Sequence, residues 1–425
     1  MKNTAHRSAP GLAKFKVASC MVLVAVGMNA SAAESAKLRQ PPVGAFGGEI
    51  AASADNPGLF GTASLTYLNI YKVTDGNGDA IVLPGRALPL QTGTPTGGAI
   101  PNGTYTLNVP AGSIDFNQKQ TQLNLVGGYL SEGLYGDGHL AFAINVPLIK
   151  QSRTFVAVQA AGTVSPTPPA ALPAAARGAI AGVAAATNAA VQAGIAATTA
   201  SQNAEVSGIG DTELSMVWVR HQDRLKVAAG VSLFVPTGLY DKTRGPNPGF
   251  GNFYTLRPGV AVTYALNPNH TDAAWDAGVT VAARLSYGIN TTNKDTDYRS
   301  GNFLYGELGV VKVMGDWAFG SNLLMTQQVS DDTGVGAPAD GSRYRSYGIG
   351  PFLSYKLPGK DAGFNLQYSD TFGARNAIVV KALQLRFVKA WYTTGLIDVD
   401  QKLADACHQS AFSFPGAPAQ AACQG

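Results

Sequence analysis

From about residue 62 onward, apolar and polar residues alternate along stretches of roughly ten residues, and turn-forming residues separate the stretches. The range 275–290 alternates over its whole length, and 139–148, 224–237 and 378–391 repeat the pattern. Successive side chains of a β-strand point to opposite faces of a sheet. Each such strand therefore has one apolar and one polar face, as strands that separate lipid from water do. In 275–290 the apolar face consists of Trp275, Ala277, Val279, Val281, Ala283, Leu285, Tyr287 and Ile289.

The alternation predicts an all-β protein, an antiparallel transmembrane β-barrel of about twelve strands. Short connections such as 132–136 alternate with long ones such as 151–211, and only 374–377 departs from this trend. Outer-membrane barrels have even strand numbers, short periplasmic turns and long extracellular loops. With both chain ends in the periplasm, the sequence fits that topology. The strands are expected near 62–73, 116–131, 137–150, 212–221, 224–237, 252–266, 275–290, 298–313, 317–329, 344–357, 362–373 and 378–391.

Tryptophan and proline positions refine this topology. Trp275, Trp317 and Trp391 fall at predicted periplasmic strand ends, with Trp218 close to one, as the aromatic girdle of a membrane interface requires. Pro258 and Pro351 lie inside predicted strands. Because proline cannot donate a ladder hydrogen bond, we expect a β-bulge at each.

Residues 155–206 interrupt the strand pattern with four prolines followed by an Ala-rich tract. Alanine is the best helix former, and the tract is too weakly apolar for a membrane-spanning helix. We therefore expect Gly178–Ala200 to be a helix that folds over or into the barrel mouth and narrows the pore. A disordered low-complexity insert is the alternative. Four apolar residues at near-helical spacing would face the barrel wall, namely Ile180, Val183, Val191 and Ile195.

The N-terminal region places the protein outside the cytoplasm. A basic segment is followed by an apolar stretch, Val17–Val26, and by small residues ending at Ala33, which is the pattern of a secretory signal peptide. Four of the 31 Lys and Arg residues lie in this leader, which leaves 27 to balance the 27 Asp and Glu residues. This balance does not support a nucleic-acid partner. Only 14% of the residues are charged, whereas soluble domains carry about 25%.

Residues able to carry chemistry are sparse. None of the spacings His-x-x-x-His, Cys-x-x-Cys or Gly-x-Ser-x-Gly is present. We therefore expect no catalytic residue, no metal and no cofactor, and hence no enzyme. His139 with a distant serine leaves an outer-membrane lipid-modifying enzyme as a remote alternative.

The polar face of the strands supplies candidate pore-lining residues. Charged groups inside a barrel of this size can pair across the interior as structural struts, or they can line a pore and bias its selectivity. Both roles require an inward position, so the alternation does not distinguish them. The candidates are Arg257, Arg284, Arg386, Glu213, Glu307 and Gln384.

The tail, residues 392–425, contains the two cysteines that remain after removal of the leader, Cys407 and Cys423. The topology places them in the oxidising periplasm, where disulfides persist. We expect a disulfide that closes a loop of about 17 residues. Two free or intermolecular thiols are the alternative.

Six short runs from Gly208 onward follow one another in a characteristic order, namely Gly208–Asp211, Pro236–Gly238, Asp297–Gly301, Gln327–Asp332, Gly348–Pro351 and Phe372–Asn376. In these runs the chain resembles outer-membrane proteins of the meta-pathway phenol degradation family. The resemblance implies a barrel, often encoded with catabolic genes, that admits hydrophobic or aromatic compounds and has no catalytic residues. The Ala-rich insert and the tail beyond Trp391 depart from the family pattern.

The sequence thus predicts a signal peptide (1–33), an N-terminal segment (34–61), a barrel (62–391) and a periplasmic tail (392–425). The expected function is an outer-membrane channel for passive uptake of small hydrophobic or aromatic compounds. Its partners would be membrane lipid and the solute, and the sequence does not indicate the oligomeric state. The first alternative is a structural or adhesive barrel without transport, and the second is the lipid-modifying enzyme.

Overall fold

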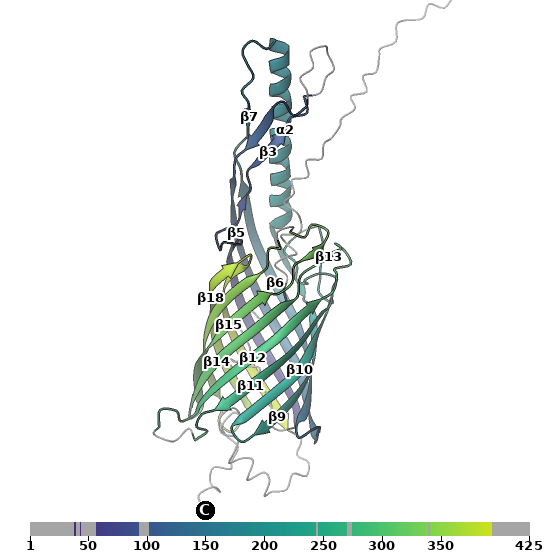
Figure 1. Cartoon of the computed structure of the whole chain (residues 1–425). Helices are drawn as coiled ribbons and strands as arrows, with labels where there is room; N and C mark the ends of the chain where they lie inside the picture. The colour runs from purple at the N-terminus through teal and green to yellow at the C-terminus, as the bar shows by residue number, and fades with distance from the viewer. Residues whose placement is uncertain are drawn as a thin grey trace, which may run out of the picture.

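The computed structural model of the chain describes residues 38–39, 43, 57–92, 102–243, 245–269, 274–338 and 341–392. A closed barrel of twelve antiparallel strands dominates it (Figure 1), which confirms the predicted fold class and strand number. Strands adjacent in the chain are neighbours in the barrel, and the pairing of the last strand with the first closes it. The barrel strands are β1 (Gly58–Val73), β5 (Gly112–Leu134), β6 (His139–Val158), β9 (Thr212–Gln222), β10 (Leu225–Val235), β11 (Thr255–Ala265), β12 (Val279–Asn290), β14 (Phe303–Met314), β15 (Trp317–Gln328), β17 (Arg345–Lys356), β18 (Ala362–Arg375) and β19 (Ile378–Tyr392).

Large apolar side chains cover the outer wall of the barrel. Leu65, Leu125, Leu285, Leu308 and Leu385 are each about half exposed, although they belong to regular, fully paired strands. Their neighbours along each strand point inward and are mostly polar or small. An apolar outer band around a polar interior is the arrangement that a lipid bilayer selects.

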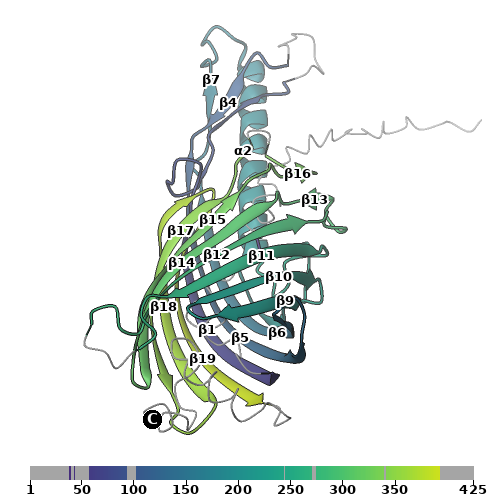
Figure 2. The same ribbon diagram turned by 60° about the horizontal axis from the view of Figure 1, so that its bottom comes forward.

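Most connections at one end of the barrel are short turns, and most at the other end are long loops (Figures 1 and 2); the exceptions are the long β11–β12 connection and the tight β18–β19 turn. We assign the short-turn end to the periplasm. Trp317 begins β15 and Trp391 lies near the end of β19, both at this end. Trp275 is also there and strongly exposed, but it precedes β12, which begins at Val279 rather than at the predicted residue 275. Trp218 Nε1 donates to the backbone oxygen of Tyr135 in a neighbouring turn at 2.6 Å.

The bulges predicted at the two prolines are wrong. Pro258 pairs with Val231 in β10, and Pro351 pairs with Ser321 in β15, both in continuous register. The pairing on the other side of each proline keeps its register across the gap. Along a strand, backbone N–H groups point alternately to the two neighbouring strands. Each proline therefore removes one ladder bond on one side only, and the chain needs no extra residue.

A long extension rises from the loop end of the barrel (Figure 1). Strands β5 and β6 continue past the barrel wall and remain paired up to Ser113 and Val158. The connection between the first two predicted strands, 74–115, contains β2 (Val82–Leu83), β3 (Arg86–Pro89) and β4 (Thr106–Val109), and β4 also pairs with β7 (Thr163–Ser165). Beside them stands the helix α2 (Ala174–Gln202), which confirms the helical insert. Three further strands are short: β8 (Ala204–Ile209), which pairs with β6, and β13 (Tyr298–Arg299) and β16 (Thr333–Gly334), which pair with each other.

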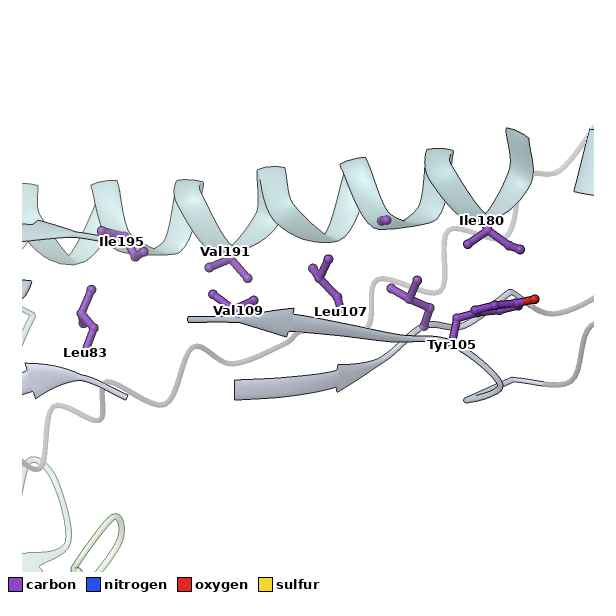
Figure 3. Packing of buried hydrophobic residues seen from close by; sticks show 9 residues of the cluster. Leu83, Tyr105, Leu107, Val109, Ile180, Val191 and Ile195 are labelled. Carbon is purple, nitrogen blue, oxygen red and sulfur yellow. The ribbon is translucent and has the colours of Figure 1, made fainter. Parts of the chain in front are cut away.

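The apolar stripe of α2 packs on the extension around the small sheet of β3, β4 and β7. The prediction that it faces the barrel wall is wrong. Leu83, Leu90, Tyr105, Leu107 and Val109 form one cluster with the helix (Figure 3). The lumenal wall mixes polar and apolar side chains, whereas β4 presents an apolar face directly opposite the helix, so the stripe loses more contact with water there. The helix residues of the cluster are Ile180, Ala184, Val191 and Ile195, with Val183 partly buried beside them.

By length and hydropathy alone, α2 could cross a membrane. Its position argues against that role, because it stands beyond one end of the barrel, whose strands make the crossing (Figure 1). Polar contacts also fix it to the extension. Asn188 exchanges two hydrogen bonds with the backbone of Gly162, and Asn203 exchanges two with the backbone of Phe155.

Candidate functional site in the barrel lumen

A cavity of about 1110 Å³ occupies the lumen. It extends from Val126 and Val219 in the periplasmic half to Gln202 and Pro246 at the extracellular mouth. Aliphatic and aromatic side chains share its wall with serine, threonine and amide groups, and charged groups lie at a few places. A concave, mainly apolar surface with a few well-placed polar groups is the usual form of a small-molecule site.

Part of the N-terminal segment lies inside this lumen. Arg39 is almost completely buried, and its Nη2 and Nε atoms donate to Asp211 Oδ2 at 2.7 and 3.1 Å. Its Nη1 donates to Thr255 Oγ1 at 2.8 Å. The guanidinium lies 4.0 Å from the ring centre of Phe253. An ion pair, a hydroxyl and an aromatic face together compensate for removing the cation from water.

Two further residues of the segment contact other parts of the wall. Leu38 packs with Phe303, Tyr305 and Tyr344, which belong to or adjoin β14 and β17. Val43 packs with Leu68 of β1, and its backbone oxygen accepts a hydrogen bond from Gln367 of β18. Arg39 is held by Thr255 of β11 and by Asp211, which directly precedes β9. Leu38, Arg39 and Val43 therefore contact different sides of the barrel and occupy part of the lumen.

Asp211 is held in place by the backbone as well. Its Oδ1 accepts the N–H of Gly238, and its Oδ2 accepts the N–H of Phe250, both at 3.0 Å. At Gly238, an added Cβ would lie 2.5 Å from Gly249, so only glycine fits this approach. The runs Gly208–Asp211 and Pro236–Gly238, which adjoin the two ends of the β9–β10 hairpin, thus meet to form the binding site for Arg39.

A second ion pair lies next to the first. Arg257 Nη2 and Glu213 Oε1 are 2.7 Å apart, and both side chains are largely buried. The pair joins β11 to β9 across β10, and Arg257 Nη1 also donates to the backbone oxygen of Arg39 at 3.1 Å. These two predicted residues therefore act as a strut and also hold the N-terminal segment.

The other four predicted pore-lining residues also point inward. Arg284, Arg386 and Gln384 line the cavity, and Arg386 Nη2 donates to Gln384 Oε1 at 2.6 Å. Gln384 in turn donates to Thr66 Oγ1 at 2.7 Å. Glu307 is 2% exposed and accepts hydrogen bonds from Asn322 and Tyr305, so it is embedded in the wall.

Amide side chains form a continuous row on the wall made by β5 and β6. Gln120 donates to Gln122 at 2.8 Å, and Gln122 donates to Asn124 at 2.9 Å. Gln151 of the facing strand donates to Gln120 at 2.7 Å. The row offers hydrogen bonds without charge along one side of the cavity, so it can solvate a polar group of a passing solute without holding it tightly.

At the extracellular mouth, the last turn of α2 reaches the cavity. Thr198, Ser201 and Gln202 belong to its lining. Gln202 Oε1 accepts a hydrogen bond from Arg153 Nη1 at 2.6 Å, and the backbone oxygen of Ser201 accepts the N–H of Gly245 at 3.2 Å. The insert predicted to gate the pore therefore touches the mouth only with its C-terminal end, while the predicted stripe lies above it in the extension.

A separate polar cluster fixes the loops around the mouth. Asp332 accepts hydrogen bonds from the Tyr298 hydroxyl, from the N–H of Gly301 at 2.7 Å and from Gln328 Nε2 at 2.6 Å. The backbone oxygen of Gly301 also accepts one from Asn290 at 3.2 Å. The runs Asp297–Gly301 and Gln327–Asp332 meet here and have a structural role.

The alternation pattern does not single out Leu38, Arg39 or Val43, because they precede the first strand. Arg39 and Asp211 are 172 residues apart, and neither residue type is unusual at its position. A signal for this site lies only in the run Gly208–Asp211, which places an acid directly before a predicted strand. Among the described residues, no group of three or more His, Cys, Asp and Glu side chains could hold a metal ion. The leader, Cys407 and Cys423 lie outside the described residues.

A family model described as "Putative MetA-pathway of phenol degradation" matches residues 101–387. The match covers more than half of the chain and includes all six runs on which the resemblance rests. The chain belongs to this family. The phenol degradation family assignment and the closed barrel together place the protein in the bacterial outer membrane.

The chain is also similar to solved structures, the first of which shares its fold. The COG4313 outer membrane channel from Pseudomonas putida F1 matches with a TM-score of 0.54 at 13% identity, over 81% of this chain and 99% of that one. A toluene transporter of P. putida, TodX, matches with a TM-score of 0.34 at 11% identity, over 81% of this chain and 92% of that one. The CymD monoaromatic hydrocarbon channel matches with a TM-score of 0.37 at 10% identity, over 80% and 90%. No curated protein sequence matches the chain. These three structures are described as channels or transporters.

Proposed function

We propose that the protein is a channel for passive uptake of small hydrophobic or aromatic compounds across the outer membrane. The observation that carries the proposal is the cavity of about 1110 Å³ that extends along the lumen of a closed barrel. Its mixed wall suits a small solute with an apolar body and one polar group, such as a phenol. The family description, which concerns phenol degradation, agrees with this solute class.

The position of the N-terminal segment implies a regulated passage. Leu38, Arg39 and Val43 occupy part of the lumen, so a solute passes freely only when they are displaced. A buried ion pair is favourable only while both partners remain together. The docked segment is therefore a closed state held by a few contacts, and its release opens the channel.

Proteoliposomes that contain the purified protein test this function. Phenol on the outside should equilibrate with the interior faster than in protein-free liposomes, with no ion gradient or nucleotide supplied. A sugar of similar mass should enter more slowly, because the row of amides alone does not replace the hydrogen bonds that its hydroxyl groups lose with water. Phenol entry equal to that of protein-free liposomes, with the barrel shown intact by its faster migration on SDS gels before boiling, would refute the proposal.

One observation favours a second candidate function, contact with an extracellular surface. The extension formed by β5, β6 and α2 projects well beyond the barrel and presents an Ala- and Thr-rich helix to solvent (Figure 2). An adhesive role needs no passage through the lumen. Loss of cell adhesion without loss of phenol entry, after deletion of 166–203, would assign the extension to this role.

A further inference from the structure

The charges along the cavity are not balanced. Among the described residues that line it, seven are basic and only four are acidic, so the wall carries a positive excess. Two of the acids, Asp211 and Glu213, are already paired with Arg39 and Arg257. A low-dielectric channel with a positive wall concentrates anions and repels cations. A purely hydrocarbon solute would gain nothing from these charges.

Arg153 is the basic residue best placed to meet a solute first. It projects from β6 into the cavity near the mouth, where its Nε donates to Gln118 Oε1 at 2.7 Å and its Nη1 donates to Gln202 Oε1 at 2.6 Å. Both partners are neutral amides. No carboxylate of the described chain lies within ion-pairing distance of it. A guanidinium has five N–H donors, so three remain, including both on Nη2.

Aromatic side chains adjoin the guanidinium. Phe116 and Phe155 face each other across β5 and β6, one register step beyond Gln118 and Arg153 on the inner face, and both line the cavity. The Arg153 guanidinium lies 5.4 Å from the ring centre of Phe116. Positively charged N–H donors, held in place beside two apolar rings, match a molecule with a carboxylate attached to an aromatic ring.

The geometry points to Arg153, with Phe116 and Phe155, as a binding site for small aromatic carboxylates at the extracellular mouth. The two amide partners hold the guanidinium in place, so it binds the carboxylate with little loss of side-chain freedom. The ring of the solute packs on the phenylalanines. The inference rests on the proposed function, since it narrows the solute class of the same channel.

Ligand-observed NMR on the detergent-purified protein tests the site independently of transport. Benzoate should bind, and benzyl alcohol and acetate should each bind at least about tenfold more weakly, since one lacks the charge and the other the ring. The variant Arg153→Gln should weaken benzoate binding at least about tenfold and leave benzyl alcohol binding unchanged. Arg153→Lys should recover part of the loss, because it restores the charge without the planar donors.

Lys150→Gln is the matched control. Lys150 lies on the same strand but points outward, where it pairs with Glu205 at 2.6 Å. The Lys150→Gln substitution also removes one positive charge, at nearly the same position along β6, and benzoate binding should not change. Equal benzoate binding by wild type and Arg153→Gln would overturn the site, as would equal binding of benzoate and benzyl alcohol by the wild type. Benzoate binding in a protein that admits no solute to liposomes would keep the site and refute only the channel.

Discussion

Replacing Arg39 with alanine should open the channel. The change removes the ion pair with Asp211, the hydrogen bond to Thr255 and the contact with the Phe253 ring, and it leaves the barrel strands untouched. Loss of one partner from a buried ion pair costs about 3–5 kcal/mol. Asp211 keeps the N–H groups of Gly238 and Phe250, so the cost should be near the lower limit.

A loss of about 3 kcal/mol shifts the equilibrium between docked and released segment by roughly a hundredfold. Leu38 and Val43 remain to hold the segment weakly. In planar bilayers, Arg39→Ala should therefore spend far more time in the conducting state than the wild type. Arg39→Lys should be intermediate, since an ammonium keeps the charge but cannot make three donations from one plane.

Arg343→Ala is the control for this experiment. Arg343 Nε and Asp331 Oδ1 are 2.7 Å apart, the same separation as in the buried pair, but both side chains are half exposed in an extracellular loop. Solvent screens such a pair, although its hydrogen bond lowers the pKa of Asp331 below the ordinary value. The control should leave gating unchanged. An open-state fraction of Arg39→Ala equal to that of the wild type, in a protein with an intact barrel, would show that Arg39 does not hold the closed state.

Three further predictions concern the extension and the tail. Leu107→Ala should destabilise the extension by about 2–5 kcal/mol, because Leu107 is fully buried between β4 and α2; limited proteolysis should then cut within the extension, and a cutting pattern identical to wild type would contradict this. Deletion of 166–203 should raise single-channel conductance without unfolding the barrel, because it removes the helix end that lines the mouth; unchanged conductance would make the insert a passive surface element. Thiol labelling of the denatured, unreduced protein should modify neither Cys407 nor Cys423, whereas labelling of both would exclude the expected disulfide.

The alternation of apolar and polar residues along each strand was enough to predict the barrel fold. A period of two places one side of every strand in lipid, and this constraint acts on each strand separately, so 275–290 or 378–391 indicates its own orientation without knowledge of its neighbours. The inward positions of Arg257, Glu213 and Arg386 follow from the same alternation. Even 62–73, where the alternation is poor, lies within a strand, because β19 and β5 supply partners on both sides.

Contacts between distant segments were decided only by the tertiary structure. The stripe of α2 required an apolar surface, and the sequence indicated the requirement but not the surface, because Leu83 and Leu107 lie in a region without clear alternation. Pro258 did not need a bulge, because its missing N–H affects the pairing with only one of the two neighbouring strands, and the register with both strands is unbroken. Arg39 is an ordinary arginine in a segment before the first strand, and its role depends on an acid 172 residues away. Alternation records where a side chain points, but the group it meets there is fixed only when the barrel closes.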